Sequence, residues 1–142
     1  MTSPEREAVT GTGATVEPLL DIQLQLLIRL LEAEPRSSLP ITLTMPGGVV
    51  SGDLITQEAW KAEWAHSVRR LGGKGAQLLA GFPESVDQSL DEASGGQMPE
   101  QLPRWVHLRD ATLSTAVKGA FTVPVWRGRL ADVSGWSLAK PE

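Results

Sequence analysis

The sequence predicts an α+β protein built on a small, bent antiparallel β-barrel or sheet, with an N-terminal helix and a helical insertion between strands 2 and 3. Two observations support this class. Residues Ile41–Ile55 form two runs separated by Pro46–Gly48; the first alternates apolar and polar side chains, and the break between them is typical of a tight reversal. From Thr56 the spacing becomes helical, and strand-like alternation returns only at Trp105.

Length and composition indicate one globular domain. The chain has 142 residues, of which 41% are hydrophobic and 21% charged, enough to bury a useful core. Residues 1–16 have almost nothing to bury and are predicted to be a disordered tail. We expect residues 17–139 to form a single α+β domain, with residues 57–103 as its helical and flexible insertion.

Charge and residue usage exclude several classes of function. A net charge of −4 argues against a nucleic-acid binder, which usually presents a basic face. The chain has no cysteine, which excludes disulfides, thiolate metal sites and cysteine catalysis and fits a cytoplasmic location. No apolar run approaches the roughly 20 residues of a membrane span, and the N-terminus lacks the pattern of a signal peptide.

The segment Glu17–Glu34 is predicted to be a helix with an unusually broad apolar face. One stripe consists of Leu20, Leu24, Leu27 and Leu31, and a second of Leu19, Ile22, Leu26 and Leu30. Either the helix only caps an open end of the barrel, or it also packs on another subunit or partner through the first stripe. Residues 21–26 also alternate, so a strand stays open as an alternative there.

Gly52 interrupts the second strand of the hairpin. Glycine inside a strand is typical of a bulge or a sharp bend, which small barrels need in order to close. We therefore expect Gly52→Val to damage folding more than any charge change in the linker.

The insertion begins with a tryptophan-containing helix. Trp60 and Trp64 lie four residues apart on one helical face, and Thr56 is positioned as its N-cap. The two indoles are interpreted either as core or as a binding face. Residues 74–103 contain a weak helical pattern and then a flexible acidic linker, which is either a mobile insertion or a loop for partner binding or self-association.

The remainder of the chain is predicted to be β, with strands near residues 105–113, 121–130 and 133–138. Pro124 has no N–H to donate and so predicts an edge strand or a bulge. Arg127 and Arg129 are two residues apart and hence on one face. They form either a clamp for phosphate or carboxylate, or an ordinary solvated face paired with Asp132 or Asp110.

No pattern in the chain predicts catalysis. His66 and His107 are the only histidines, and no metal-ligand spacing, nucleophile elbow or phosphate-loop motif accompanies them. We therefore expect no enzyme activity, no catalytic residue, no metal and no cofactor.

The order of elements resembles that of Sm-like small barrels. The resemblance rests on Ile41–Thr44 with Gly52–Leu54, on Val106–Ala111, and on Val125–Val133 with its Arg127-Gly128 step. It implies an RNA-binding ring that would use Arg127 and Arg129, which we keep as the alternative function. The acidic-hydrophobic-Asn stretch of that family is replaced here by Gln57–Trp64.

A closer resemblance is to the gas vesicle accessory protein U family. It rests on Leu39–Thr44 with Gly47–Ile55, on the tryptophan-containing helix, on Val106–Ala111 and on Trp126–Trp136. It implies a cytoplasmic, non-enzymatic accessory protein, distinct from the shell protein and possessing no established catalytic residues. We expect it to self-associate into a homo-oligomer and to bind the gas vesicle shell or other accessory proteins, through Leu20, Leu24, Leu27, Leu31, Trp60, Trp64, Arg127 and Arg129.

Overall fold

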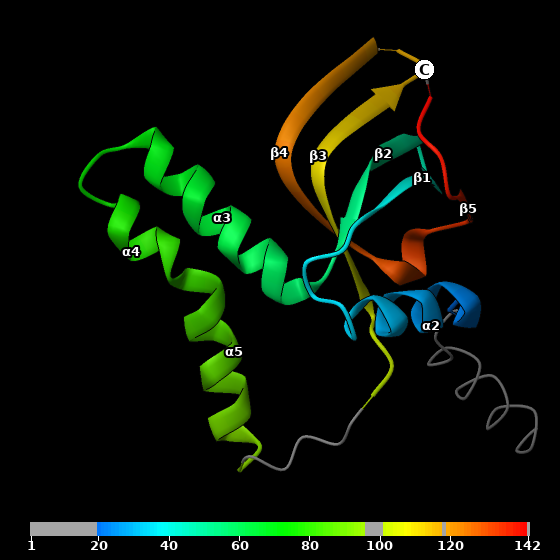
Figure 1. The fold of residues 1–142 in the computed structure, drawn as a ribbon. Helices are drawn as coiled ribbons and strands as arrows, with labels where there is room; N and C mark the ends of the chain where they lie inside the picture. The colour runs from blue at the N-terminus through cyan, green and yellow to red at the C-terminus, as the bar shows by residue number, and fades with distance from the viewer. Residues whose placement is uncertain (1–19, 96–100, 118, 142) are drawn as a thin grey trace, which may run out of the picture.

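The computed structural model describes residues 20–95, 101–117 and 119–141 (Figure 1). The predicted tail, residues 1–16, lies outside this part of the chain, as do residues 96–100 of the predicted linker. The elements in chain order are α2 (Ile22–Leu31), β1 (Leu39–Met45), β2 (Gly48–Ile55), α3 (Gln57–Leu71), α4 (Ala76–Ala80), α5 (Phe82–Ala93), β3 (Trp105–Thr115), β4 (Gly119–Arg129), the 3-10 turn η1 (Leu130–Asp132) and β5 (Gly135–Ser137).

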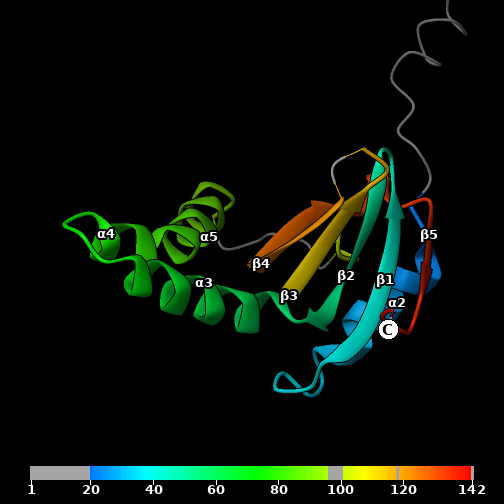
Figure 2. The same ribbon diagram turned by 90° about the horizontal axis from the view of Figure 1, so that it is seen from above.

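The α+β class is confirmed, and the sheet is antiparallel and strongly bent (Figures 1 and 2). Its strand order is β4-β3-β2-β1-β5. The sheet is not a closed barrel, because β4 and β5 lie at its two edges and β5, only three residues long, pairs with β1. The Sm-like pattern is therefore not confirmed as a barrel.

The first hairpin forms where the alternation predicts it. Met45 pairs with Gly48, so Pro46 and Gly47 alone make the turn. Gly47 has φ +85°, a conformation that suits glycine. This tight connection sets the register of the two strands that carry much of the core.

The expected irregularity at Gly52 is present, but the extra residue belongs to β3. The pairing passes from Ser51↔Thr112 to Asp53↔Arg109, so Gly52 faces two residues of β3. One of these is Asp110, with φ +52°. The bulge bends the sheet at this point, and Gly52 provides the close approach that the bulge requires.

The main core lies between α2 and the sheet. It contains Leu24, Ile28 and Leu31 of α2, Ile41 and Leu43 of β1, Val50 and Leu54 of β2, Val106, Leu108 and Ala111 of β3, and Leu130 of η1. A helix is confirmed within the predicted segment as α2, but it is shorter than Glu17–Glu34, since it begins at Ile22 and ends at Leu31. Asp21 is its N-cap, and its Oδ1 accepts from Leu24 N at 3.1 Å. The strand alternative for residues 21–26 is wrong in the structure.

The insertion folds into a helical arm, α3 to α5, which projects from one side of the sheet (Figure 2). Thr56 caps α3 as expected, since its Oγ1 accepts from Ala59 N at 3.1 Å. Trp64 Nε1 donates to Leu79 O at 2.8 Å and joins α3 to α4. The weak helical pattern becomes two helices, because Pro83 stands in the first turn of α5, where proline is tolerated.

Candidate functional site

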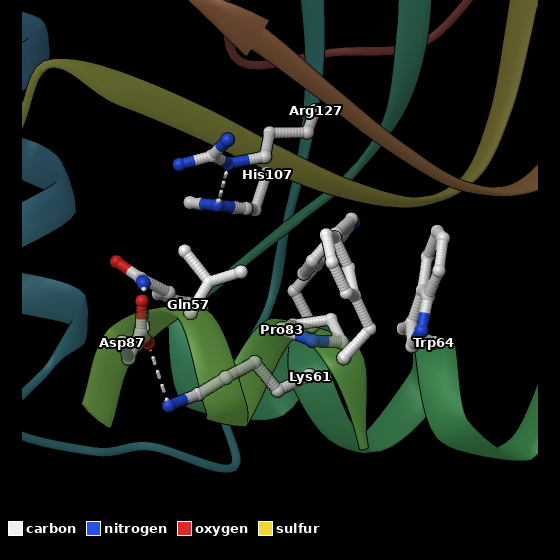
Figure 3. A pocket seen from close by; sticks show the side chains of 10 residues that line it. Gln57, Lys61, Trp64, Pro83, Asp87, His107 and Arg127 are labelled. Carbon is white, nitrogen blue, oxygen red and sulfur yellow. Dashed lines mark hydrogen bonds and ion pairs between the residues drawn. The ribbon is translucent and has the colours of Figure 1, made fainter. Parts of the chain in front are cut away.

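A cavity of about 130 Å³ lies where the helical arm meets the sheet (Figure 3). Its lining residues come from two helices of the arm, α3 and α5, and from two strands of the sheet, β3 and β4. The lining residues are Gln57, Trp60, Lys61, Trp64, Phe82, Pro83, Val86, Asp87, His107 and Arg127. Both apolar rings and charged groups therefore border one small space.

Lys61 forms the charged contact between α3 and α5. Its Nζ lies 2.7 Å from Glu58, 2.8 Å from Glu84 and 2.9 Å from Asp87. Burial of the ammonium lowers its pKa, but hydrogen bonds to the three carboxylates outweigh this effect, and the pKa of Lys61 lies above its usual value. Gln57 Nε2 also donates to Asp87, at 3.0 Å, so the carboxylate of Asp87 accepts hydrogen bonds from both Lys61 and Gln57.

The opposite wall holds a cross-strand pair of His107 and Arg127 (Figure 3). Arg127 Nε donates to His107 Nε2 at 3.1 Å, and the guanidinium lies 3.9 Å from the ring centroid of Trp105. Because Nε2 accepts a hydrogen bond, neutral His107 holds its proton on Nδ1. Desolvation first, and then the positive charge of Arg127, lower the pKa of His107 to about 3, although Asp87 acts in the opposite sense.

The buried neutral His107 should make stability depend on pH. In the unfolded chain this histidine binds a proton near its ordinary pKa of 6.5, whereas the folded protein resists protonation down to about pH 3. Protons therefore favour the unfolded chain in this interval. Lowering the pH from 7 to 5 is expected to reduce the free energy of unfolding by about 2 kcal/mol.

Urea denaturation at several pH values measures this effect. His107→Gln should remove most of the slope between pH 5 and 7, and His66→Gln, at an exposed position on α3, should leave it unchanged. If all three proteins lost stability equally on acidification, the assignment to His107 would be wrong.

Two tryptophans of α3 form the aromatic side of the cavity. The rings of Trp60 and Trp64 lie 5.6 Å apart, and that of Trp60 lies 5.2 Å from His107. Trp60 is buried, and its Nε1 has no hydrogen-bond partner within the described part of the chain. The interpretation as core applies to Trp60, which is buried. Trp64 is half-buried at the cavity, and for it the interpretation as a binding face stays open.

The predicted leucine stripe of α2 faces the sheet. Leu24 and Leu31 belong to the buried core, and Leu20 and Leu27 pack against it, half-buried. The apolar side chains of α2 that face solvent are Ile22, Leu26 and Leu30, which belong to the second stripe. A contact between the first stripe and a partner stays a prediction, and the second stripe is the more accessible surface.

The two arginines have different partners in the structure. Arg127 contacts His107 and Trp105, whereas Arg129 lies 3.2 Å from Asp132 in a two-pronged pair. Asp132 raises the pKa of Arg129 through hydrogen bonds and its charge. Arg129 therefore pairs with Asp132, as one of the two interpretations expects, and a binding role for either arginine stays a prediction.

Sequence reasoning did not connect Lys61, Asp87 and His107, because they come from three separate segments. The contact between His107 and Arg127 does have a signal in the sequence, because these two residues stand directly opposite each other once β3 and β4 are aligned. Among the described residues, no group of three or more His, Asp or Glu side chains could hold a metal ion. In the same part of the chain, no helix is long and apolar enough to cross a membrane.

The fold and the cavity together define a class: a small α+β protein with an open sheet, a helical arm and ionisable groups that are engaged with one another. Residues 21–141 match the family described as "Gas vesicle protein GvpU-like", and the chain belongs to this family of gas vesicle accessory proteins. The resemblance noted from the sequence is confirmed. The family is not known as enzymatic.

Neither the curated proteins nor the solved structures contain a match to this chain. The family match and the geometry are therefore the two sources for a functional proposal. Nothing in either supports the alternative of an RNA-binding ring.

Proposed function

We propose that this protein acts in the assembly or clustering of gas vesicles through protein–protein contact and self-association, without catalysis. Family membership supports the setting. The observation that supports the mode of action is the solvent-facing stripe of α2. Ile22, Leu26 and Leu30 recur every four residues and are between 52% and 69% exposed.

An apolar stripe of this kind is typical of a surface that another protein covers. The three side chains share one helical face, so a second helix or another copy of α2 could cover them together. The open sheet offers a further contact, since β4 is an 11-residue edge strand. Both features fit a cytoplasmic protein that binds the gas vesicle shell or other gas vesicle accessory proteins.

The proposal predicts concentration-dependent association. Light scattering and sedimentation should show the wild type as an oligomer, and Ile22→Ser with Leu26→Ser and Leu30→Ser should shift it toward the monomer. The same variant should be recovered with buoyant gas vesicles to a smaller extent than the wild type. Hydrophobic burial of three side chains would account for a loss of affinity of at least about a hundredfold.

The control removes three other exposed apolar side chains: Leu71, Val117 and Leu138, each changed to serine. This variant should associate like the wild type. A strict monomer at every concentration, which never fractionates with gas vesicles, would refute the proposal.

A further inference from the structure

Helix α5 presents an apolar stripe that is distinct from that of α2. Phe82, Val86 and Leu90 lie one turn apart and are between 38% and 55% exposed. Together with Ser85 and Ser89 they border a shallow hollow of about 310 Å³ on the outside of the helix. We call these three apolar side chains the α5 face.

The surroundings of the α5 face are acidic. Residues 75–95 contain four carboxylates, those of Glu84, Asp87, Asp91 and Glu92, and no basic side chain. Lys61 approaches from α3, but Glu58, Glu84 and Asp87 all surround its single ammonium. Arg127 lies on the opposite wall of the adjoining cavity, so the carboxylates around the apolar stripe outnumber the cations and the local field is negative.

The α5 face is continuous with the cavity described above. Phe82 and Val86 line both the cavity and the outer hollow. The cavity adds the rings of Trp60 and Trp64, and Trp60 Nε1 is a buried donor without a partner in the described residues. An apolar side chain resting on the α5 face could therefore continue into an aromatic-lined space.

We propose that the α5 face binds a basic amphipathic helix of a partner protein. The apolar side chains of the α5 face recur at i, i+4 and i+8, a spacing that the apolar side chains of a partner helix can meet along one face. Lysines or arginines that flank those side chains on the partner would face the carboxylates of α5. A second copy docking through the same face would instead bring two sets of four carboxylates together, which is unfavourable. That the partner is a gas vesicle component rests on the proposed function, whereas the mode of binding does not.

A synthetic peptide tests the proposal on the full-length protein. The probe is a labelled helix of about 18 residues, or five turns, with leucines on one face and lysines on the other. Its matched control has every lysine replaced by glutamate. Fluorescence anisotropy should show the lysine peptide binding at least about tenfold more tightly than the glutamate peptide, with affinity that falls as salt is added.

Variants then locate the site. Val86→Ser with Leu90→Ser should weaken binding of the lysine peptide by about tenfold or more, because both side chains are exposed and their loss leaves the core intact. Asp91→Lys with Glu92→Lys should reduce the preference for the lysine peptide. Leu71→Ser with Val117→Ser, two exposed positions outside both apolar stripes, is the matched control and should not alter binding.

Any of three peptide-binding results would overturn the proposal: equal binding of both peptides, equal loss in the Leu71→Ser with Val117→Ser control, or no binding of the lysine peptide at low salt. A change of oligomeric state in Val86→Ser with Leu90→Ser would also overturn it, because the occupant would then be a second copy. The peptide assay contains no vesicles. Its failure is therefore distinguishable from a failure of association or vesicle recovery, which the α2 variants measure.

Discussion

Gly52→Val is expected to lower the free energy of unfolding by about 3 kcal/mol. A Cβ atom at position 52 would lie 3.0 Å from Arg109 O and 3.1 Å from Ala111 Cα. Both are backbone atoms of β3, so no side-chain rotation relieves the contact. Valine adds two further methyl groups at the bulge, and β2 and β3 must separate to admit them.

Urea denaturation followed by tryptophan fluorescence measures this loss. Gly135→Val is the matched control, since the same substitution in strand β5 meets no atom within 4 Å. It should change stability by no more than about 0.5 kcal/mol. A wild-type midpoint for Gly52→Val would show that the sheet adapts to a side chain at the bulge. Glu92→Gln in the acidic insertion gives the comparison with a charge change, and it too should be nearly neutral.

The fate of Gly52 illustrates what a single sequence contains. A glycine within an alternating run predicts an irregularity, because local pattern and local geometry are linked. Which of the two paired strands contains the extra residue depends on the register between them. Asp110, with its positive φ, stands on β3, more than fifty positions away. Strand existence could thus be predicted, whereas the location of the bulge and the openness of the sheet depend on pairing between distant segments.

The cavity could be predicted from the sequence even less than the bulge, because its residues come from separate segments. Trp60 and Trp64 were recognisable as a pair because both belong to one helix. The ion pair of Lys61 with Asp87 requires α5 to fold back on α3, and Gly81 with Pro83 made that helix look weak. Tertiary contact outweighs local propensity here. Phe82, Val86 and Leu90, spaced by four, were the signal for the α5 face.

Helix α2 shows a third kind of difficulty. Its two leucine-rich stripes have the same helical spacing, so periodicity finds both and cannot rank them. The choice is made by the sheet, which packs on Leu24 and Leu31 and leaves Leu26 and Leu30 in solvent. Stability and association should consequently respond to different leucines of one helix.

Leu24→Ala is expected to lower the free energy of unfolding by about 3 kcal/mol, because it deletes a fully buried side chain and leaves a cavity in the core between α2 and the sheet. Leu26→Ala makes the same chemical change two residues later, at a position that is half exposed. Its effect on unfolding should stay within about 0.5 kcal/mol, since helix propensity changes equally in both variants.

The same two proteins should give the opposite order in association. Light scattering at a temperature where both are folded should show Leu26→Ala as the weaker self-associating protein, and Leu24→Ala as close to the wild type. Equal losses of stability would contradict the placement of α2 on the sheet. Loss of association in Leu24→Ala alone would mean that the first stripe, rather than Ile22, Leu26 and Leu30, meets the partner. The pair therefore separates the contribution of α2 to the core from its contribution to assembly.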